Sequence, residues 1–135
     1  MIKRYLVSGM LIVVLASLAI NLFLYSTEEK QAEKVRVEIK IDFGASEKNE
    51  VIEVQNGTTV FEILGEVVTV DYEEYAGMGK IITSINGITM NDTYSWLYFV
   101  NDEIAMVSVD NYLLTEDSSI IFKYLTNEEA LEYFS

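Results

Sequence analysis

Carboxylates are the most numerous side chains here that could do acid–base chemistry, and some stand next to each other, as in Asp102-Glu103 and Glu116-Asp117. A glycosidase works with two acids that flank the bond it cleaves. Neighbouring residues of a strand point to opposite faces of a sheet, so such a pair cannot converge on one bond. Acidic turns are also expected without catalysis, because the chain has 22 acidic and 9 basic residues.

The residue types on which most enzymes and metal sites depend are missing, since the chain has no His and no Cys. His is the commonest general base and transition-metal ligand, and Cys supplies disulfides and thiolate ligands. A serine nucleophile would need another base such as Lys, and no Ser-x-x-Lys occurs after the apolar N-terminus. We therefore expect no enzyme, no catalytic residues, no metal site and no cofactor.

An acidic and aromatic segment, residues 71–79, contains Tyr72, Tyr75 and Met78. We predict that residues 69–79 form a loop. Such a loop could bind a partner or, through its carboxylates, calcium, although EF-hand spacing is absent. The alternative interpretation is a solvated charged loop without a site.

Residues 95–100 contain the single Trp and have the composition of a buried strand, which we expect at the centre of a sheet. The strand period places Trp96 and Tyr98 on one face and Leu97 and Phe99 on the other. The first pair could form an aromatic platform for a planar ligand or a sugar, or could simply fill the sheet. The second pair is wholly apolar, so we expect it to face the core.

The other elements follow from periodicity and turn signals. Residues 35–43 alternate apolar and charged side chains, and residues 50–54 return as the second strand of a hairpin. Thr59 and Glu62 have the spacing of a helix cap before an apolar stripe at helical spacing. Strands are expected at 80–85, 104–106 and 120–125, with a turn at Asn86-Gly87 and a last helical turn over 127–134 capped by Thr126. This order predicts an α+β fold, a mixed sheet with one helix packed across it.

The N-terminus predicts a transmembrane signal anchor over residues 1–26. Lys3 and Arg4 precede an uncharged apolar segment, residues 5–25, which would be about 31 Å long as a helix. All acidic residues follow this segment, so the N-terminus should be cytoplasmic and the C-terminal domain extracytoplasmic, on a single-pass cell-membrane protein. Residues 27–34 are polar and would form a short stalk.

Two other fates of the N-terminus remain open. Residues 17–19 form a small-x-small site, and signal-peptide cleavage there would release a secreted protein that begins at Ile20. Cleavage between Gly9 and Met10 would resemble prepilin processing and would favour a structural subunit of a surface assembly, although the acidic residue usual in such helices is missing.

The net charge of -13 argues against nucleic-acid binding and leaves cationic partners open.

The domain resembles the transcobalamin-like C-terminal domain family, a β-grasp module found on bacterial and archaeal surface proteins. The most specific match is the run from Trp96 to Asn101. The other matches are residues 35–43, 57–60, 79–87, 117 and 120–124, with Ala105, Tyr112 and Leu114. The resemblance implies a β-grasp domain over residues 35–125, followed by a short helical tail, 126–135. Three turns depart from the family pattern, at Asn101-Asp102, Ser108 and residues 117–119.

The resemblance also bears on the ligand. The related domain closes over cobalamin in transcobalamin and intrinsic factor, where a barrel domain supplies half of the site. No such barrel accompanies this domain, so cobalamin is not expected for this chain alone. We predict a membrane-anchored, extracytoplasmic, non-catalytic module that binds a small ligand or an envelope protein. The candidate binding residues are Tyr72, Tyr75, Met78, Trp96, Tyr98, Asn101 and Tyr112.

Overall fold

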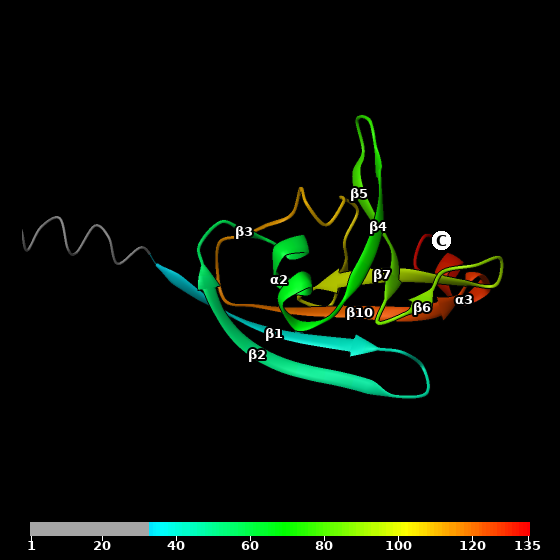
Figure 1. The fold of residues 1–135 in the computed structure, drawn as a ribbon, viewed down its shortest axis with the longest axis horizontal. Coiled ribbons are helices and arrows are strands. Elements are labelled where there is room, and N and C mark those ends of the chain that lie inside the picture. Colours follow the sequence, from blue (N-terminus) through cyan, green and yellow to red (C-terminus); the bar gives the residue numbers. More distant parts are fainter. Residues whose placement is uncertain (1–32) are drawn as a thin grey trace, which may run out of the picture. The chain divides into compact units, whose positions relative to one another are not determined.

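The computed structural model describes residues 33–135. The predicted anchor, both predicted cleavage points and most of the predicted stalk lie outside the described residues. Within them, neither helix has the length and apolar character that a membrane span needs. The elements in chain order are β1 (Lys34–Asp42), β2 (Glu47–Gln55), β3 (Thr58–Thr59), α2 (Val60–Val67), β4 (Val70–Tyr75), β5 (Gly79–Ile85), β6 (Ile88–Thr89), β7 (Tyr94–Val100), β8 (Glu103–Ile104), β9 (Leu113–Leu114), β10 (Ser118–Thr126) and α3 (Asn127–Glu132) (Figure 1).

The described residues form a mixed, sheet-rich α+β fold with two helices, as the order of elements predicted. The main sheet has the strand order β2-β1-β10-β7-β8, in which β1 and β10 are parallel and the other neighbours antiparallel. Two small sheets, β3-β9 and β4-β5-β6, complete the fold. The middle position belongs to β10 rather than to β7, which lies one place nearer the edge. The two-residue β8 covers only one end of β7, and this exposes the rest of that edge.

The core lies between the main sheet and α2. The alternation of β1 is confirmed, with apolar residues buried on the face toward α2. At the start of the helix, the Thr59 hydroxyl accepts a hydrogen bond from the Glu62 N–H (3.1 Å), so the predicted cap is also confirmed. The core includes Val35, Val37, Ile39, Ile41, Val60, Ile63, Leu64, Val67, Ile85, Leu114, Ile120 and Phe122.

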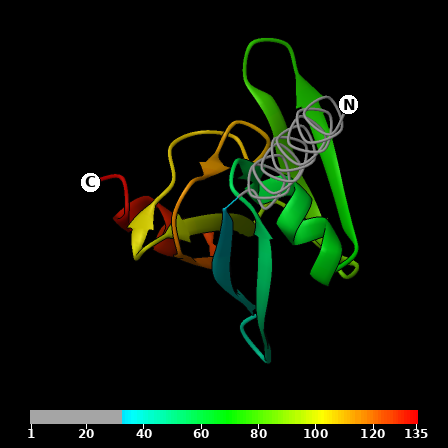
Figure 2. The ribbon, with the colours of Figure 1, turned by 90° about the vertical axis from the view of Figure 1, so that its left-hand side faces the viewer.

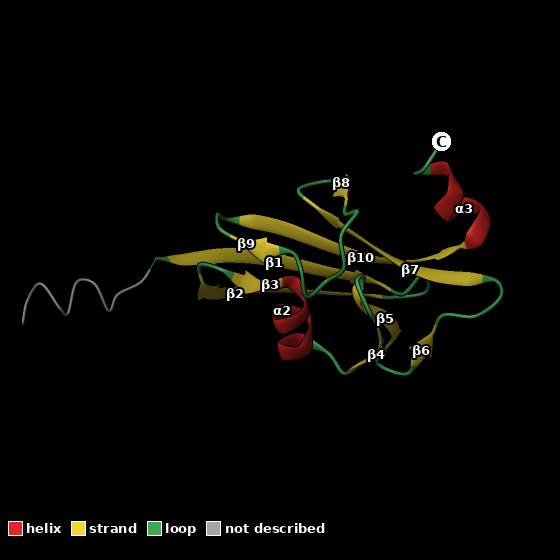
Figure 3. Ribbon diagram, turned by 90° about the horizontal axis from the view of Figure 1, so that it is seen from above, coloured by secondary structure: helices red, strands yellow, loops and turns green. Residues whose placement is uncertain are grey.

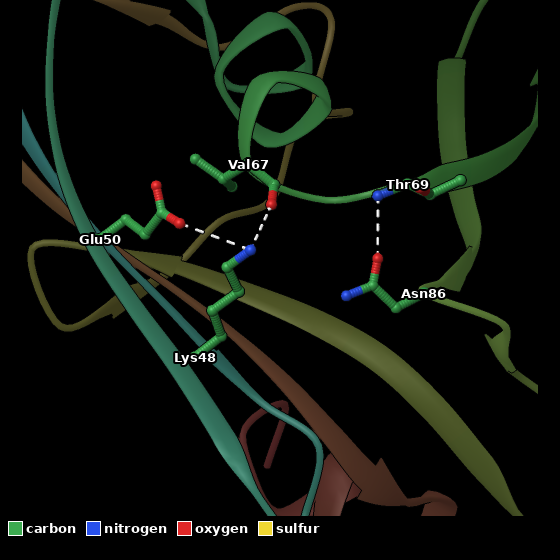
Figure 4. A network of polar contacts seen from close by, with 5 residues as sticks. All are labelled: Lys48, Glu50, Val67, Thr69 and Asn86. Atoms are coloured by element: carbon green, nitrogen blue, oxygen red, sulfur yellow. Dashed lines mark hydrogen bonds and ion pairs between the residues drawn. The ribbon is translucent and has the colours of Figure 1, made fainter.

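Polar contacts fix the end of α2 and the chain that leaves it (Figure 4). The last turn of α2 contains no basic residue, and Lys48 of β2 supplies the missing cation: its Nζ lies 2.8 Å from the Val67 carbonyl oxygen and 3.4 Å from a Glu50 carboxylate oxygen. Beyond the helix, the backbone N–H of Thr69 donates to Asn86 Oδ1 (2.9 Å), and the Asn86 N–H donates to the Thr69 carbonyl (2.8 Å). The helix is thereby joined to both β2 and the β5–β6 turn.

The prediction of a loop over residues 69–79 is wrong. Val70–Tyr75 forms β4, which pairs antiparallel with β5 and has an irregularity between Asp71 and Tyr72. The resulting hairpin extends away from α2 and the main sheet (Figure 2). Because most side chains of β4 are exposed on both faces, its sequence has no alternation of apolar and polar residues. Backbone pairing with the apolar β5 defines this strand.

The prediction that Leu97 and Phe99 face the core is also wrong. Tyr98 belongs to the core with Trp96 packed against it, whereas Phe99 is buried on the opposite face of the sheet. There its ring lies edge-on to the Tyr133 ring, 5.0 Å away, beside α3. The polar atoms of the core pair have partners: the Trp96 indole N–H donates to the Ile88 carbonyl (2.9 Å) and the Tyr98 hydroxyl to the Val107 carbonyl.

The two helices lie on opposite faces of the main sheet, with α2 and the strands β4 to β6 on one side and α3 on the other (Figure 3). α3 begins at the predicted cap, where Thr126 and Glu129 exchange both bonds of a capping box. It ends at Glu132, two residues before the predicted end. β2 and β10 are longer than predicted and β8 is shorter.

Candidate binding cleft

A cleft of about 760 Å³ opens where β5, β7 and residues 104–111 meet. One wall comes from the β4–β5 hairpin, another from the edge of β7, and a third from the segment that follows β8. Most of the lining residues are apolar. The polar side chains among them are Lys80, Ser108 and Asn111, and Trp96 and Tyr98 each add one polar atom. The lining consists of Gly77, Met78, Lys80, Ile81, Ile82, Trp96, Leu97, Tyr98, Ile104, Ala105, Met106, Val107, Ser108, Val109, Asn111, Phe122 and Phe134.

Tyr98 joins the cleft to the core. Its ring stacks on Phe122, with ring centroids 5.3 Å apart, and stands edge-on to Tyr112 at 6.4 Å. Its hydroxyl donates to the Val107 carbonyl and thereby holds the segment after β8 against the sheet. Burial raises the pKa of the Tyr98 phenol far above its ordinary value of 10.0, and the nearby Tyr112 and Asp110 add to the shift. The phenol therefore stays protonated as a hydrogen-bond donor.

The hairpin wall is attached to residues 108–111 through Gly79. The Lys80 N–H donates to Asp110 Oδ1 (2.9 Å), while Asn111 Nδ2 donates to Ser108 Oγ (2.6 Å). Gly79 has a φ of +99°, and an added Cβ would lie 2.6 Å from Asp110 Oδ1, 2.8 Å from Asn111 Nδ2 and nearer still to Ser108 Oγ. The positive φ favours glycine here, and any larger residue would have to displace these three side-chain ends. We call residues 79, 80, 108, 110 and 111 the Gly79 junction.

The Gly79 junction also perturbs a carboxyl group. The hydrogen bond from the Lys80 N–H lowers the pKa of Asp110 below its ordinary value of 3.8, and desolvation opposes the shift. The lower pKa keeps Asp110 ionised, so it continues to accept the bond that holds the hairpin.

The rim of the cleft carries exposed apolar side chains. Met106 is 74% exposed, Met78 62% and Phe134 57%, although each lines the cleft. Single exposed apolar residues are ordinary on a protein surface, but several that converge on one concavity are typical of a binding site.

Three of the seven predicted binding residues come together in the cleft: Met78, Trp96 and Tyr98. Tyr72 lies on the hairpin outside it, edge-on to Phe61 at 5.0 Å. Tyr75, also on the hairpin, donates its hydroxyl to the Glu73 carboxylate, which raises the pKa of the phenol. Both of these tyrosines are more than two-fifths exposed.

The remaining two predicted residues serve the fold. Asn101 has a φ of +51° in the β7–β8 turn, and its Oδ1 accepts a bond from the Ser119 N–H (2.9 Å). The Tyr112 carbonyl accepts from the Val60 N–H (3.0 Å) at the start of α2, while its ring packs on Tyr98. Neither lines the cleft.

The sequence did not predict that the third wall, residues 104–109, or the C-terminal residue Phe134 would line a cleft. The sequence predicts a strand over residues 104–106, whereas β8 ends at Ile104. The sequence does contain one indication of this wall, the apolar pair Met106-Val107, for which no buried partner is predicted. Within residues 33–135, no three His, Cys, Asp or Glu side chains gather closely enough to hold a metal ion.

Fold and cleft together define a sheet-rich α+β domain with an open apolar cleft beside its main sheet. The chain belongs to the family described as Domain of unknown function (DUF4430), whose model matches residues 57–126. These residues include α2, the hairpin and every wall of the cleft except Phe134. No match was found among curated proteins.

Two solved structures share the fold. Haptocorrin in complex with Cbi has a TM-score of 0.63 and 16% identity, over 70% of this chain and 25% of haptocorrin. A candidate metal-binding protein from Ruminococcus gnavus ATCC 29149 has a TM-score of 0.53 and 15% identity, over 69% of this chain and 98% of that protein. This chain thus spans about a quarter of haptocorrin. With the family match, they confirm the predicted resemblance to the transcobalamin-like domain family.

Proposed function

We propose that this chain is a membrane-anchored, extracytoplasmic binding module that takes a small ligand or part of an envelope protein into the cleft, without catalysis. The observation that carries the proposal is the convergence of Met78, Met106 and Phe134 around a cleft of about 760 Å³. Apolar surface in a concavity gains free energy when a ligand covers it, and the few polar atoms beside it can orient that ligand.

The fold of the domain supports the same proposal. A mixed sheet with α2 across one face fits the β-grasp class, in the domain that we assign to residues 35–125. A solved relative with this fold, haptocorrin, was crystallised in complex with Cbi. The match spans about a quarter of that protein, so the ligand of haptocorrin is not carried over to this cleft.

The absence of catalysis is proposed from the side chains at the cleft. Its lining offers one ammonium group, Lys80, whose Nζ lies 4.3 Å from the Phe61 ring centroid and is turned onto that ring. The buried Tyr98 phenol is held neutral by its environment. This phenol is therefore not available as a general base near neutral pH.

The membrane anchor is proposed from the sequence alone. The apolar segment 5–25 and the charges on its two sides favour a single span with the domain outside the cell membrane. Intact mass of the protein from membrane and medium fractions tests this. Full-length mass in membranes is the expected result. A chain beginning at Ile20 would instead support a secreted binder, and one beginning at Met10 a subunit of a surface assembly.

Photo-crosslinking in native membranes tests the cleft. A photoreactive amino acid in place of Met106 should give discrete adducts, seen by intact mass as either a small molecule or a second protein. The matched control is Val51 of β2, which is also more than half exposed but lies at the other edge of the main sheet. Equal labelling from both positions, or none from Met106 and Met78, would contradict the proposed site.

A further inference from the structure

One edge of β7 faces β10 and the other faces the cleft. On the cleft side, the Ala105 N–H donates to the Tyr98 carbonyl and the Asn91 N–H to the Tyr94 carbonyl, both at 3.0 Å. Backbone groups in a strand alternate between its two edges. The N–H and C=O of Trp96, midway between Tyr94 and Tyr98, therefore also point toward the cleft.

The Trp96 backbone has no strand beside it on that edge. β8 pairs only with Phe99 and Val100. Within the described chain, no backbone hydrogen bond reaches Trp96 from the cleft side. The open stretch is centred on Trp96, because the Tyr94 and Tyr98 carbonyls on either side of it already accept bonds from Asn91 and Ala105. An unpaired edge of this kind is a template for an added strand.

The cleft has apolar walls on both faces of this edge. Trp96 and Tyr98 point to the face that carries the core, together with the cleft residue Val109. Leu97 points to the other face, and Phe134 lines the cleft with it. An added strand presents successive side chains to alternate faces, so consecutive apolar side chains of such a strand would each find an apolar wall.

The charge around the cleft favours a partner with basic residues on either side of its bound segment. Most basic residues of the described chain lie far from the cleft, on β1 and β2; they are Lys34, Arg36, Lys40 and Lys48. The other two are Lys80 and Lys123, whose ammonium groups lie over the rings of Phe61 (4.3 Å) and Phe99 (5.0 Å). By contrast, Glu103 directly precedes the lining residue Ile104, and Asp110 stands in the sequence between the lining residues Val109 and Asn111, although the charge of Lys80 offsets part of its own. This surface attracts cations.

We infer that the occupant of the cleft is an extended, apolar polypeptide segment flanked by Lys or Arg, which adds as a strand to the open edge of β7 antiparallel or parallel to it. The inference rests on the proposed function, because it names the occupant of the same cleft. Hydrogen bonds to the Trp96 backbone give affinity, the two apolar walls select side chains, and the acidic surroundings favour basic flanks.

The test uses the full chain in detergent and a displayed library of nine-residue peptides. Their five central positions are drawn from Val, Ile, Leu, Phe, Tyr and Thr, and the flanks are Lys pairs or, as the matched control, Glu pairs. We expect enrichment of Lys-flanked peptides by about tenfold or more. In the complex, hydrogen exchange at the Trp96 amide should slow by at least about tenfold, because this N–H gains an acceptor.

An N-methyl scan of the strongest peptide separates strand addition from simple apolar binding. Methylation should lower affinity by about tenfold at one position, that of the peptide N–H which donates to the Trp96 carbonyl, and should have little effect at its neighbours. No enrichment of Lys-flanked peptides, or a scan in which no single position stands out, overturns the inference. If Met106 still gives crosslinks in membranes, the proposed function survives that failure; if it gives none, both fail.

Discussion

The core under α2 and the cleft beside β7 are both lined by apolar side chains, but only the first is closed. Ile63, Leu64 and Phe122 are at most 1% exposed, whereas Met78 and Met106 at the cleft are mostly exposed. Burial of apolar area stabilises a fold by about 25 cal/mol per Å², and exposed side chains gain little of it. Folding therefore accounts for the residues of the core, while those of the rim need another explanation, for which we propose binding.

The largest expected effect breaks the closed region. Phe122→Ala removes a fully buried ring that stacks on Tyr98, and should lower the free energy of unfolding by about 3–5 kcal/mol. The matched change at the cleft, Phe134→Ala, should change it by less than about 0.5 kcal/mol. Denaturant unfolding followed by Trp96 fluorescence measures both. Similar losses from the two variants would mean that the rim is part of the core.

The next prediction breaks the connection between the hairpin and residues 108–111. Gly79→Ala combines a positive φ with a Cβ that must displace the hydrogen-bonded side chains of Ser108, Asp110 and Asn111, and should destabilise the protein by about 2–4 kcal/mol. Gly77→Ala in the same hairpin is the control, because its φ is +81° but nothing lies within 4 Å of the added Cβ. It should cost about 1–2 kcal/mol. An equal loss at both positions would show that the contacts of Gly79 contribute nothing.

A smaller effect is expected at Tyr98, which belongs to the core and also lines the cleft. Tyr98→Phe keeps the ring in the core but leaves the Val107 carbonyl without its donor, and should cost about 1–2 kcal/mol. Tyr75→Phe also removes a hydroxyl that donates a hydrogen bond, but at an exposed position of the hairpin. Tyr75→Phe should leave the free energy of unfolding nearly unchanged, as denaturant unfolding can measure. Equal losses from Tyr98→Phe and Tyr75→Phe would contradict the prediction for Tyr98.

The smallest effect depends on pH. The pKa of Asp110 is lowered in the folded state, so its contribution to stability is present above the ordinary value of 3.8 and is lost as pH falls through the lower folded value. Asp110→Asn should therefore be less stable than the parent near pH 7, and the difference should shrink on acidification below pH 3.8. Asp71→Asn, at a carboxylate without a hydrogen bond within residues 33–135, is the control and should be as stable as the parent near pH 7.

Local signals predicted much of the fold. The alternation of β1, the Thr59 and Thr126 caps and the Asn86-Gly87 turn each depend on residues within a few positions of one another, and the structure confirms them. Such patterns depend on the residues within one helix, strand or turn, so they can be recognised without knowledge of the rest of the fold.

The elements that the sequence did not predict depend on distant partners. β4 is a strand only because β5 pairs with it. Trp96 and Tyr98 face the core because carbonyls of Ile88 and Val107 accept their polar hydrogens, and neither acceptor can be read from the strand itself. The cleft could be predicted only in part, because its third wall is an irregular segment whose position is fixed by the Gly79 junction.

The parallel pairing of β1 with β10 has a mechanical consequence. Six residue pairs join the first strand of the domain to the last, from Val37 with Ser118 to Asp42 with Lys123, and β10 in turn pairs along its length with β7. A pull on Lys34 directed along β1, opposed by a partner held at β7, would load these ladders in shear. All their hydrogen bonds would then bear the tension together and would not open one after another, so the domain would resist mechanical unfolding in this direction.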